Sequence, residues 1–378
     1  MPAHKRQHFV PQFYLRLFSD GKNFVRCFNK SRALLIERAP IKGQCAINNY
    51  YEWHEGVEKS LGVVEGIAAS LIHKLAAVLD LKELSSEEHA FLRMFIAIQT
   101  GRTKVAGDSN DAMTTHYAHL MAQRAPELEG VDLSKFVIKN TFPAALPLQA
   151  MIEGADRLES LSAGLLLNTT RFPFFCSDNP VIRYNTQAAH VRHQGVTGLE
   201  SPGLQIIFAI SPTAAVYLYD PDVYGPPSNT GIRFLTEDDA AKIAMLHYLW
   251  SDENIYVPPG FTGAIAFELH RLLAEFQTFE RLKIIESQPS KHPNGQVGSM
   301  IHQFQPHAPI ELSFRFAKVR QPYDDDRFSR FHPRRVQLSD VVNDVISYDV
   351  KPYEMHEHLK GTRLSRAEME LRRVAKLA

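Results

Sequence analysis

The chain has 378 residues, of which 44% are hydrophobic, enough to bury the core of one large domain or two ordinary ones. Lysine plus arginine and aspartate plus glutamate both number 42, so the formal net charge is zero. This balance excludes binding to nucleic acid or anionic membranes driven by overall charge, and such binding would need a local patch. Cys27, Cys45 and Cys176 are widely spaced, which argues against a disulfide framework or a cysteine-based zinc site and favours a reducing cytoplasm.

The first ten residues, MPAHKRQHFV, contain no long apolar region, so we expect no secretory signal. No run approaches the roughly 18 consecutive apolar residues that suggest a membrane helix. We therefore expect a soluble cytoplasmic protein that does not engage a membrane.

The segment KRQHFVPQFYLRLF, residues 5–18, places cations, a histidine and an aromatic run around one proline. Proline suits the first helical position, so a helix is predicted to begin at Pro11. On this helix Tyr14 and Phe18 share one face, and Gln12 and Arg16 share another.

The rest of the first half is predicted to be mostly helical. After a strand pair at 23–30 and 32–38, residues 50–80 form a long helix with one apolar stripe. A second helix at 85–103 begins with a capping box of Ser85 and Glu88. Helices are also expected at 109–125 and 147–161.

The second half changes character and is richer in strands. Residues 164–185 are predicted to form a β-hairpin, and residues 203–220 two strands around a Ser-Pro break. An amphipathic helix over 236–257 has Thr236 as its N-cap, and a further helix covers 261–286.

These elements predict an α+β fold, with a mainly helical N-terminal half packed on an antiparallel β-sheet that carries further helices. We expect a single domain over residues 1–286. The turn formers of SQPSKHPNGQVG, residues 287–298, predict a linker, and residues 299–378 form a C-terminal appendage that ends in a helix.

Four polar features stand out against this background. The first is His8 with Lys5, Arg6 and Arg16 around a helix N-terminus, where free N–H groups and the helix dipole favour an anion. The alternative is an exposed basic leader, or a histidine that only closes the domain.

The second feature is the pair Glu58 and Glu65, seven residues apart and nearly aligned on the long helix. Glu65 lies at the edge of the apolar stripe, where a partly desolvated carboxylate can act as a general base or a metal ligand. The alternative is a solvated or salt-bridged glutamate.

The third feature is Gln99 and Arg102, which end the apolar face of the helix predicted at 85–103. A guanidinium that points toward the core needs a partner, either a protein carboxylate or an anionic ligand. A structural salt bridge, for example to Glu65, is the alternative to a ligand.

The fourth feature is Asp178 and Asn179 in CSDNPV, where a rigid strand end can present a functional carboxylate. Asp-Asn-Pro is also ordinary turn chemistry. The sequence contains no phosphate-binding loop, dinucleotide fingerprint, nucleophile elbow or HExxH motif, and His116 and His119 lack a nearby carboxylate motif that would complete a metal site.

Four short motifs, HFVPQFYLRLF, IAIQTGRT, FFCSDNPV and IFAISP, occur in this order and resemble the family catalogued as domain of unknown function 4238. The resemblance covers roughly residues 4–275, and the chain departs from it at Ala209, where the family's PLSP run has a proline. It implies no reaction. It implies that the following residues belong to the recurring set: His8, Tyr14, Arg16, Gln99, Arg102, Asp178 and Asn179.

We expect these polar residues to share one pocket that suits phosphoester chemistry on nucleic acid or nucleotides, with Mg²⁺ or Mn²⁺ as a candidate cofactor. The candidate catalytic residues are His8, Glu65 and Asp178. The candidate substrate-binding residues are Tyr14, Arg16, Gln99, Arg102 and Asn179. We therefore expect a phosphoesterase or nuclease-like hydrolase. One alternative is a non-catalytic nucleotide-binding, anion-binding or protein-interaction module, and another is a buried polar network that joins the helical and β halves.

Overall fold

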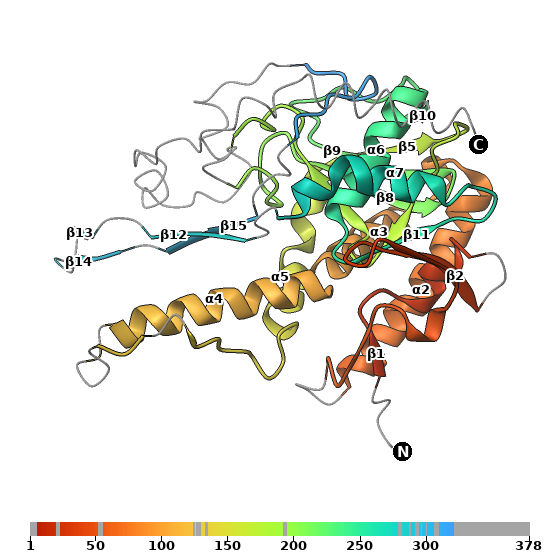
Figure 1. Ribbon diagram of the computed structural model, residues 1–378. Helices are drawn as coiled ribbons and strands as arrows, with labels where there is room; N and C mark the ends of the chain where they lie inside the picture. The colour runs from red at the N-terminus through yellow and green to blue at the C-terminus, as the bar shows by residue number, and fades with distance from the viewer. Residues whose placement is uncertain are drawn as a thin grey trace.

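A computed structural model shows an α+β fold, as predicted (Figure 1). It describes residues 6–19, 23–51, 56–123, 125, 130–132, 135–191, 195–278, 282–286, 289–291, 295, 297–299, 301–305 and 310–320. The predicted C-terminal helix and Lys5 lie outside the described residues.

A five-stranded sheet forms the centre of the fold, in the order β10-β5-β9-β8-β7. Its strands are β5 (Ser162–Leu167), β7 (Val181–Tyr184), β8 (Gln205–Ser211), β9 (Ala214–Tyr219) and β10 (Ile232–Phe234). The two strands predicted around the Ser-Pro break are β8 and β9, which pair as an antiparallel hairpin. Every residue of β9 is buried, as expected for a strand with a neighbour on each side. Only β10 runs parallel to its neighbour, so the sheet is mixed rather than antiparallel throughout.

The β-hairpin predicted over residues 164–185 is wrong. β5 pairs with β9 and β10, whereas β7 pairs with β8. Leu165 and Leu166 are both fully buried, so β5 is apolar on both faces and requires a place inside the sheet. The intervening β6 (Cys176–Ser177) joins a different sheet.

That second sheet has four antiparallel strands in the order β3-β2-β11-β6. It contains the strand pair predicted near the N-terminus, β2 (Phe24–Asn29) with β3 (Leu34–Pro40), and β11 (Asn254–Val257) from the end of the region predicted as helix 236–257. A further short pair joins β1 (Arg6–His8) to β4 (Ala46–Asn48).

The predicted helices of the first half are present. They are α1 (Gln12–Arg16), α2 (Val57–Val78), α3 (Ser86–Gly101), α4 (Lys104–Gln123) and α5 (Ala145–Glu153), with 3₁₀ turns η1 (Ile41–Gly43), η2 (Leu81–Glu83) and η5 (Ala155–Ser160). Ser85 and Glu88 form the predicted capping box that begins α3. α3 packs against α2, α5 and β7, so its C-terminal end is enclosed by the rest of the fold.

In the second half, α6 (Glu237–Trp250) begins at the predicted N-cap Thr236 and packs against α7 (Ala264–Leu273), which continues into η6 (Ala274–Thr278). The region predicted as a linker, residues 287–298, contains the short strand pair β13 (Ser290–Lys291) and β14 (Val297–Gly298). A second pair, β12 (Lys283–Glu286) with β15 (Ile301–Phe304), flanks this region, so the last residues of the helix predicted over 261–286 form a strand instead. Beyond them, Ile310, Leu312, Phe314 and Phe316 are buried in the core. The predicted domain boundaries stay predictions.

α2 is also long and apolar enough, by length and composition alone, to cross a membrane, although no such helix was expected from the sequence. A core helix passes the same test, and residues such as Leu71 and Leu75 of α2 are buried in the core. Its outward side chains Val63 and Ile67 are exposed. This single helix is weak evidence for a membrane.

Candidate functional site

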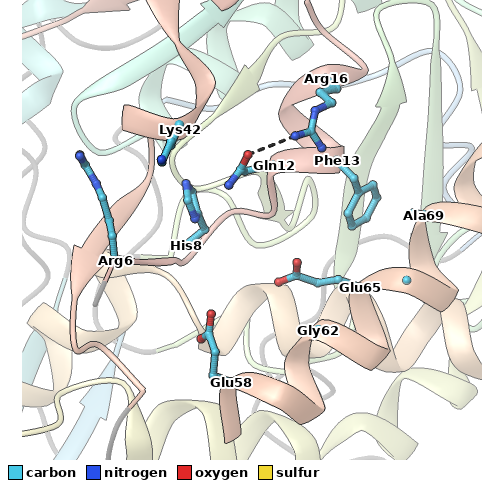
Figure 2. Close-up of a pocket in the computed structure, with 11 residues that line it drawn as sticks. Arg6, His8, Gln12, Phe13, Arg16, Lys42, Glu58, Gly62, Glu65 and Ala69 are labelled. Atoms are coloured by element: carbon cyan, nitrogen blue, oxygen red, sulfur yellow. Dashed lines mark hydrogen bonds between the residues drawn. The ribbon is translucent and has the colours of Figure 1, made fainter. Parts of the chain in front are cut away.

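A polar hollow of about 800 Å³ opens between the N-terminal segment and α2 (Figure 2). β1 and α1 supply one side, η1 supplies the rim, and the first half of α2 supplies the opposite side. Its lining consists of Arg6, His8, Gln12, Phe13, Arg16, Lys42, Glu58, Gly62, Glu65, Gly66 and Ala69.

Cations gather on the side formed by β1, α1 and η1. Arg6 donates a hydrogen bond from Nη2 to the carbonyl of Gly43 (3.1 Å), and Arg16 donates from Nη2 to Oε1 of Gln12 (3.1 Å). The second bond joins Gln12 and Arg16, which were predicted to share one face of this helix. With Lys42 this side of the hollow carries three exposed cations, which give it a local positive potential.

His8 lies among these cations and points into the hollow (Figure 2). Burial lowers its pKa below the ordinary value, against the opposing effects of a hydrogen bond to the Lys42 backbone and the charge of Glu65. Nε2 is closed off from solvent and has no hydrogen-bond partner among the described residues. The imidazole is therefore neutral at pH 7, with an unused ring nitrogen that can accept a proton.

α2 presents two carboxylates to the same hollow, Glu58 and Glu65, two turns apart (Figure 2). Gly62 and Gly66 of α2 also line the hollow, and a Cβ at either position would meet nothing within 4 Å. Two glycines inside a helix cost about 2 kcal/mol relative to alanine. Neither close packing nor a turn requires glycine at these two positions. The two glycines of the helix were not among the residues singled out from the sequence.

Lys42 was also missed. It lies in η1, far along the chain from His8 and Arg16, and a single exposed lysine after a strand has no distinguishing pattern. The pairing of β1 with β4 and the hydrogen bond from Arg6 to the carbonyl of Gly43 bring η1 beside the N-terminal segment.

Arg102 lies behind the hollow rather than in its lining, and its side chain is only 2% exposed. Nη2 donates to Oε1 of Glu65 (2.8 Å) and to the carbonyl of His8 (2.6 Å), and Nε donates to the hydroxyl of Tyr51 (3.3 Å). The salt bridge to Glu65, one of the two alternatives drawn from the sequence, is therefore present. Arg102 fixes the carboxylate and the backbone that form the walls.

Gln99 and Tyr14 are buried and hold the N-terminal segment in place. Gln99 donates from Nε2 to the carbonyl of Phe9 (2.9 Å). The hydroxyl of Tyr14 donates to the carbonyl of Ala209 (2.6 Å), and its ring stacks on Phe208 of β8. These side chains do not line the hollow; they position the residues that do.

The expectation that Asp178 and Asn179 share this pocket is corrected by their contacts. The Asp178 carboxylate accepts hydrogen bonds from the backbone N–H groups of Asp252, Glu253 and Asn254 (2.7–2.8 Å), and Asn179 donates from Nδ2 to the carbonyl of Trp250 (2.9 Å). Both side chains bind the connection from α6 to β11, so these bonds are long-range and differ from the local turn bonds that the sequence offered as the alternative. Of the residues predicted to share one pocket, His8, Arg16 and Glu65 line it.

Within the described residues, no group of three or more histidine, cysteine, aspartate or glutamate side chains is placed to hold a metal ion. The divalent cation considered from the sequence stays a prediction.

Residues 6–259 match the family described as "Protein of unknown function (DUF4238)", and the chain belongs to this family. No curated protein and no solved structure matches the chain. The motifs noted in the sequence thus have a structural explanation: Tyr14, Gln99, Asp178 and Asn179 each bind a distant backbone carbonyl or N–H group.

We expect Glu65→Gln to lower the free energy of unfolding by about 2 kcal/mol, because it leaves the buried Arg102 without a counter-charge. Glu83→Gln, at an exposed glutamate in η2 directly after α2, is the control, with an expected change below about 0.5 kcal/mol. Urea unfolding measures both. Equal effects of the two substitutions would show that the ion pair with Arg102 is not what stabilises this region.

The raised pKa of Asp178 predicts that the free energy of unfolding depends on pH. Burial, followed by the charge of Asp252, raises its pKa to about 6 against the pull of three backbone hydrogen bonds. Because the folded-state pKa exceeds the unfolded value of about 3.9, the folded protein binds this proton more tightly, and its stabilisation is lost as the pH rises through about 6.

The unfolding free energy of the wild type minus that of Asp178→Asn should therefore rise by about 3 kcal/mol on going from about pH 7.5 to about pH 4. Urea unfolding of both proteins at the two pH values measures the difference. A difference that is independent of pH would show that the Asp178 pKa is the same in the folded and unfolded chains.

Proposed function

We propose that the hollow binds the phosphate group of a nucleotide or of a nucleic-acid end. The observation that carries this proposal is the convergence of Arg6, Arg16 and Lys42 with His8 on one side of a concave site. Arginine and lysine are the side chains that proteins use to hold phosphate oxygens. A volume of about 800 Å³ lies in the range of sites that enclose small molecules.

The side of the hollow formed by α2 favours a ligand that is anionic at one end and carries hydrogen-bond donors at the other. Glu58 and Glu65 repel an anion from α2 and accept hydrogen bonds from hydroxyl or amino groups. A nucleotide has both parts, since its phosphates are anionic and its sugar and base carry hydrogen-bond donors. The phosphate therefore lies at the cationic side, and the nucleoside extends over Gly62 and Gly66.

Isothermal titration calorimetry with adenosine, AMP, ADP and ATP tests the proposal. Affinity should increase with phosphate number and decrease with added salt, because the cations are exposed. The double substitution Arg6→Gln with Lys42→Gln should weaken ADP binding by roughly tenfold or more. Arg32→Gln, which removes an exposed charge at the turn between β2 and β3, is the control and should change it by less than about twofold.

Two results would contradict phosphate binding: adenosine binding as tightly as ADP, or equal losses in the double variant and in Arg32→Gln. Circular dichroism of each variant would establish that the fold is retained.

A second candidate function is hydrolysis of a phosphoester, and the specific observation that favours it is the unpartnered Nε2 of His8. Once a small rotation of the ring exposes Nε2 to the hollow, neutral His8 would take a proton from a water molecule as the water oxygen bonds to phosphorus. The bond from phosphorus to the leaving oxygen breaks, and that oxygen receives a proton from solvent or from the protonated His8. Arg6 and Arg16 would stabilise the charge that develops on the phosphate oxygens.

We expect His8→Gln to lower kcat for hydrolysis of bis(p-nitrophenyl) phosphate or a short RNA by roughly 100-fold or more. Wild-type activity should fall below the His8 pKa, which burial holds under its ordinary value, and this acid limb should disappear in the variant. His73→Gln, an exposed histidine of α2 outside the hollow, is the matched control. Phosphate binding without any hydrolysis would leave the non-catalytic binding module as the function, and full activity in a folded His8→Gln protein would show that His8 is not the base.

A further inference from the structure

A second hollow, of about 510 Å³, lies on the other side of the C-terminal end of α3. Residues of α3, α4, α5, β7 and β15 line it, together with the loop around Thr197. Its walls are mainly apolar and include Met113, Leu146, Met151, Trp250 and Phe304. This composition contrasts with the charged hollow beside α2.

Arg183 of β7 is the one charged residue among the described residues that line this second hollow, apart from the titratable imidazole of His302. Nη1 donates to the carbonyl of Thr197 (3.3 Å), and Nη2 donates to Oε1 of Gln305. Nε is buried and has no hydrogen-bond partner among the described residues. Two of its five N–H groups are therefore occupied by neutral oxygens, and one is left unused beside an apolar cavity.

The described part of the chain provides no carboxylate to Arg183, although it pairs Arg26, Arg102, Arg157, Arg171 and Arg271 with glutamates. Burial lowers the Arg183 pKa to about 10, and no neighbouring negative charge offsets this effect. A desolvated guanidinium without a counter-ion is costly, so its retention in an apolar pocket needs a reason.

The other titratable group in the lining supplies no counter-charge. Burial lowers the pKa of His302, so its imidazole is neutral at pH 7. The remaining polar groups, such as Thr103, Asn179 and Gln303, are uncharged. The hollow thus combines one positive charge with neutral, largely apolar walls.

We propose that this second hollow binds a small amphipathic carboxylate, an aryl- or alkyl-substituted acid whose carboxylate pairs with Arg183 and whose apolar body contacts Trp250 and Phe304. A single cation matches a monoanion, whereas the several cations of the first hollow match a phosphate. A carboxylate fits the unused Nε–H and the adjacent Nη2 of one guanidinium through two parallel hydrogen bonds. The volume accommodates a molecule of this class.

The test compares acids with neutral isosteres on the wild-type protein. 3-Phenylpropionate and octanoate should bind, and each should bind at least tenfold more tightly than its primary amide, as measured by calorimetry. Binding should also change the fluorescence of Trp250, measured in a Trp53→Phe background because these are the two tryptophans of the chain.

Arg183→Met should abolish this preference for the acid while leaving the weak binding of the amide unchanged. Arg171→Met is the matched control, because Arg171 is an arginine outside the hollow that pairs with Glu237. It should retain the full preference for the acid.

Equal affinity of acid and amide for the wild type, or no binding of either acid, would overturn the proposal even if Arg183→Met fails to fold. Unchanged acid binding in a folded Arg183→Met protein would overturn it as well. ADP should not compete with 3-phenylpropionate, because the two ligands belong to different hollows.

Discussion

The buried guanidinium of Arg102 is the interaction on which the arrangement of the charged hollow depends. It connects the end of α3 to Glu65 of α2 and to the carbonyl of His8. Its side chain is 2% exposed, whereas that of Glu65 is 27% exposed, so the cation is desolvated and the carboxylate still meets water. A buried cation of this kind is retained only if its partners stay in place, which makes the positions of α2 and of the N-terminal segment interdependent.

The start of the N-terminal segment is held through its backbone carbonyls rather than through the His8 side chain that lines the hollow. Arg102 binds the carbonyl of His8, and Gln99 binds the carbonyl of Phe9. These backbone bonds leave the His8 imidazole oriented into the hollow (Figure 2). Tyr14 then anchors α1 to β8, so Arg16 is presented from a helix fixed to the central sheet. Side chains that are positioned by such contacts need little reorganisation when a ligand arrives.

The sequence predicted the features that depend on local patterns. The capping box of α3, the hairpin around the Ser-Pro break and the N-cap Thr236 require only neighbouring residues. The need of Arg102 for a partner was also predictable, because a charge that ends an apolar stripe must be compensated. Glu65 was a candidate partner because it lies at the edge of the apolar stripe on α2, where its carboxylate can reach the core.

Features that depend on long-range pairing were not predictable in this way. β5 reaches its neighbours β9 and β10 only after the chain has passed through β6 and β7, so the local turn residues wrongly indicated a hairpin. The role of Asp178 depends on N–H groups more than 70 residues away. Arg183 could not be singled out from the sequence, because VIRYN has the pattern of an ordinary strand. That no carboxylate of the described residues pairs with it is a property of the folded protein only.

The end of α3 separates the two hollows and gives them opposite character. Arg102 extends toward the charged hollow, while Gly101 and Thr103 on either side of it line the apolar one. A Cβ at Gly101 would lie 2.6 Å from the carbonyl oxygen of Pro147, so only glycine lets α5 approach this closely. The cations of the first hollow are exposed and are screened by salt beyond about 8 Å. The guanidinium of Arg183 in the second hollow is half-buried, so its interactions with other charges are screened less by solvent than those of the exposed cations.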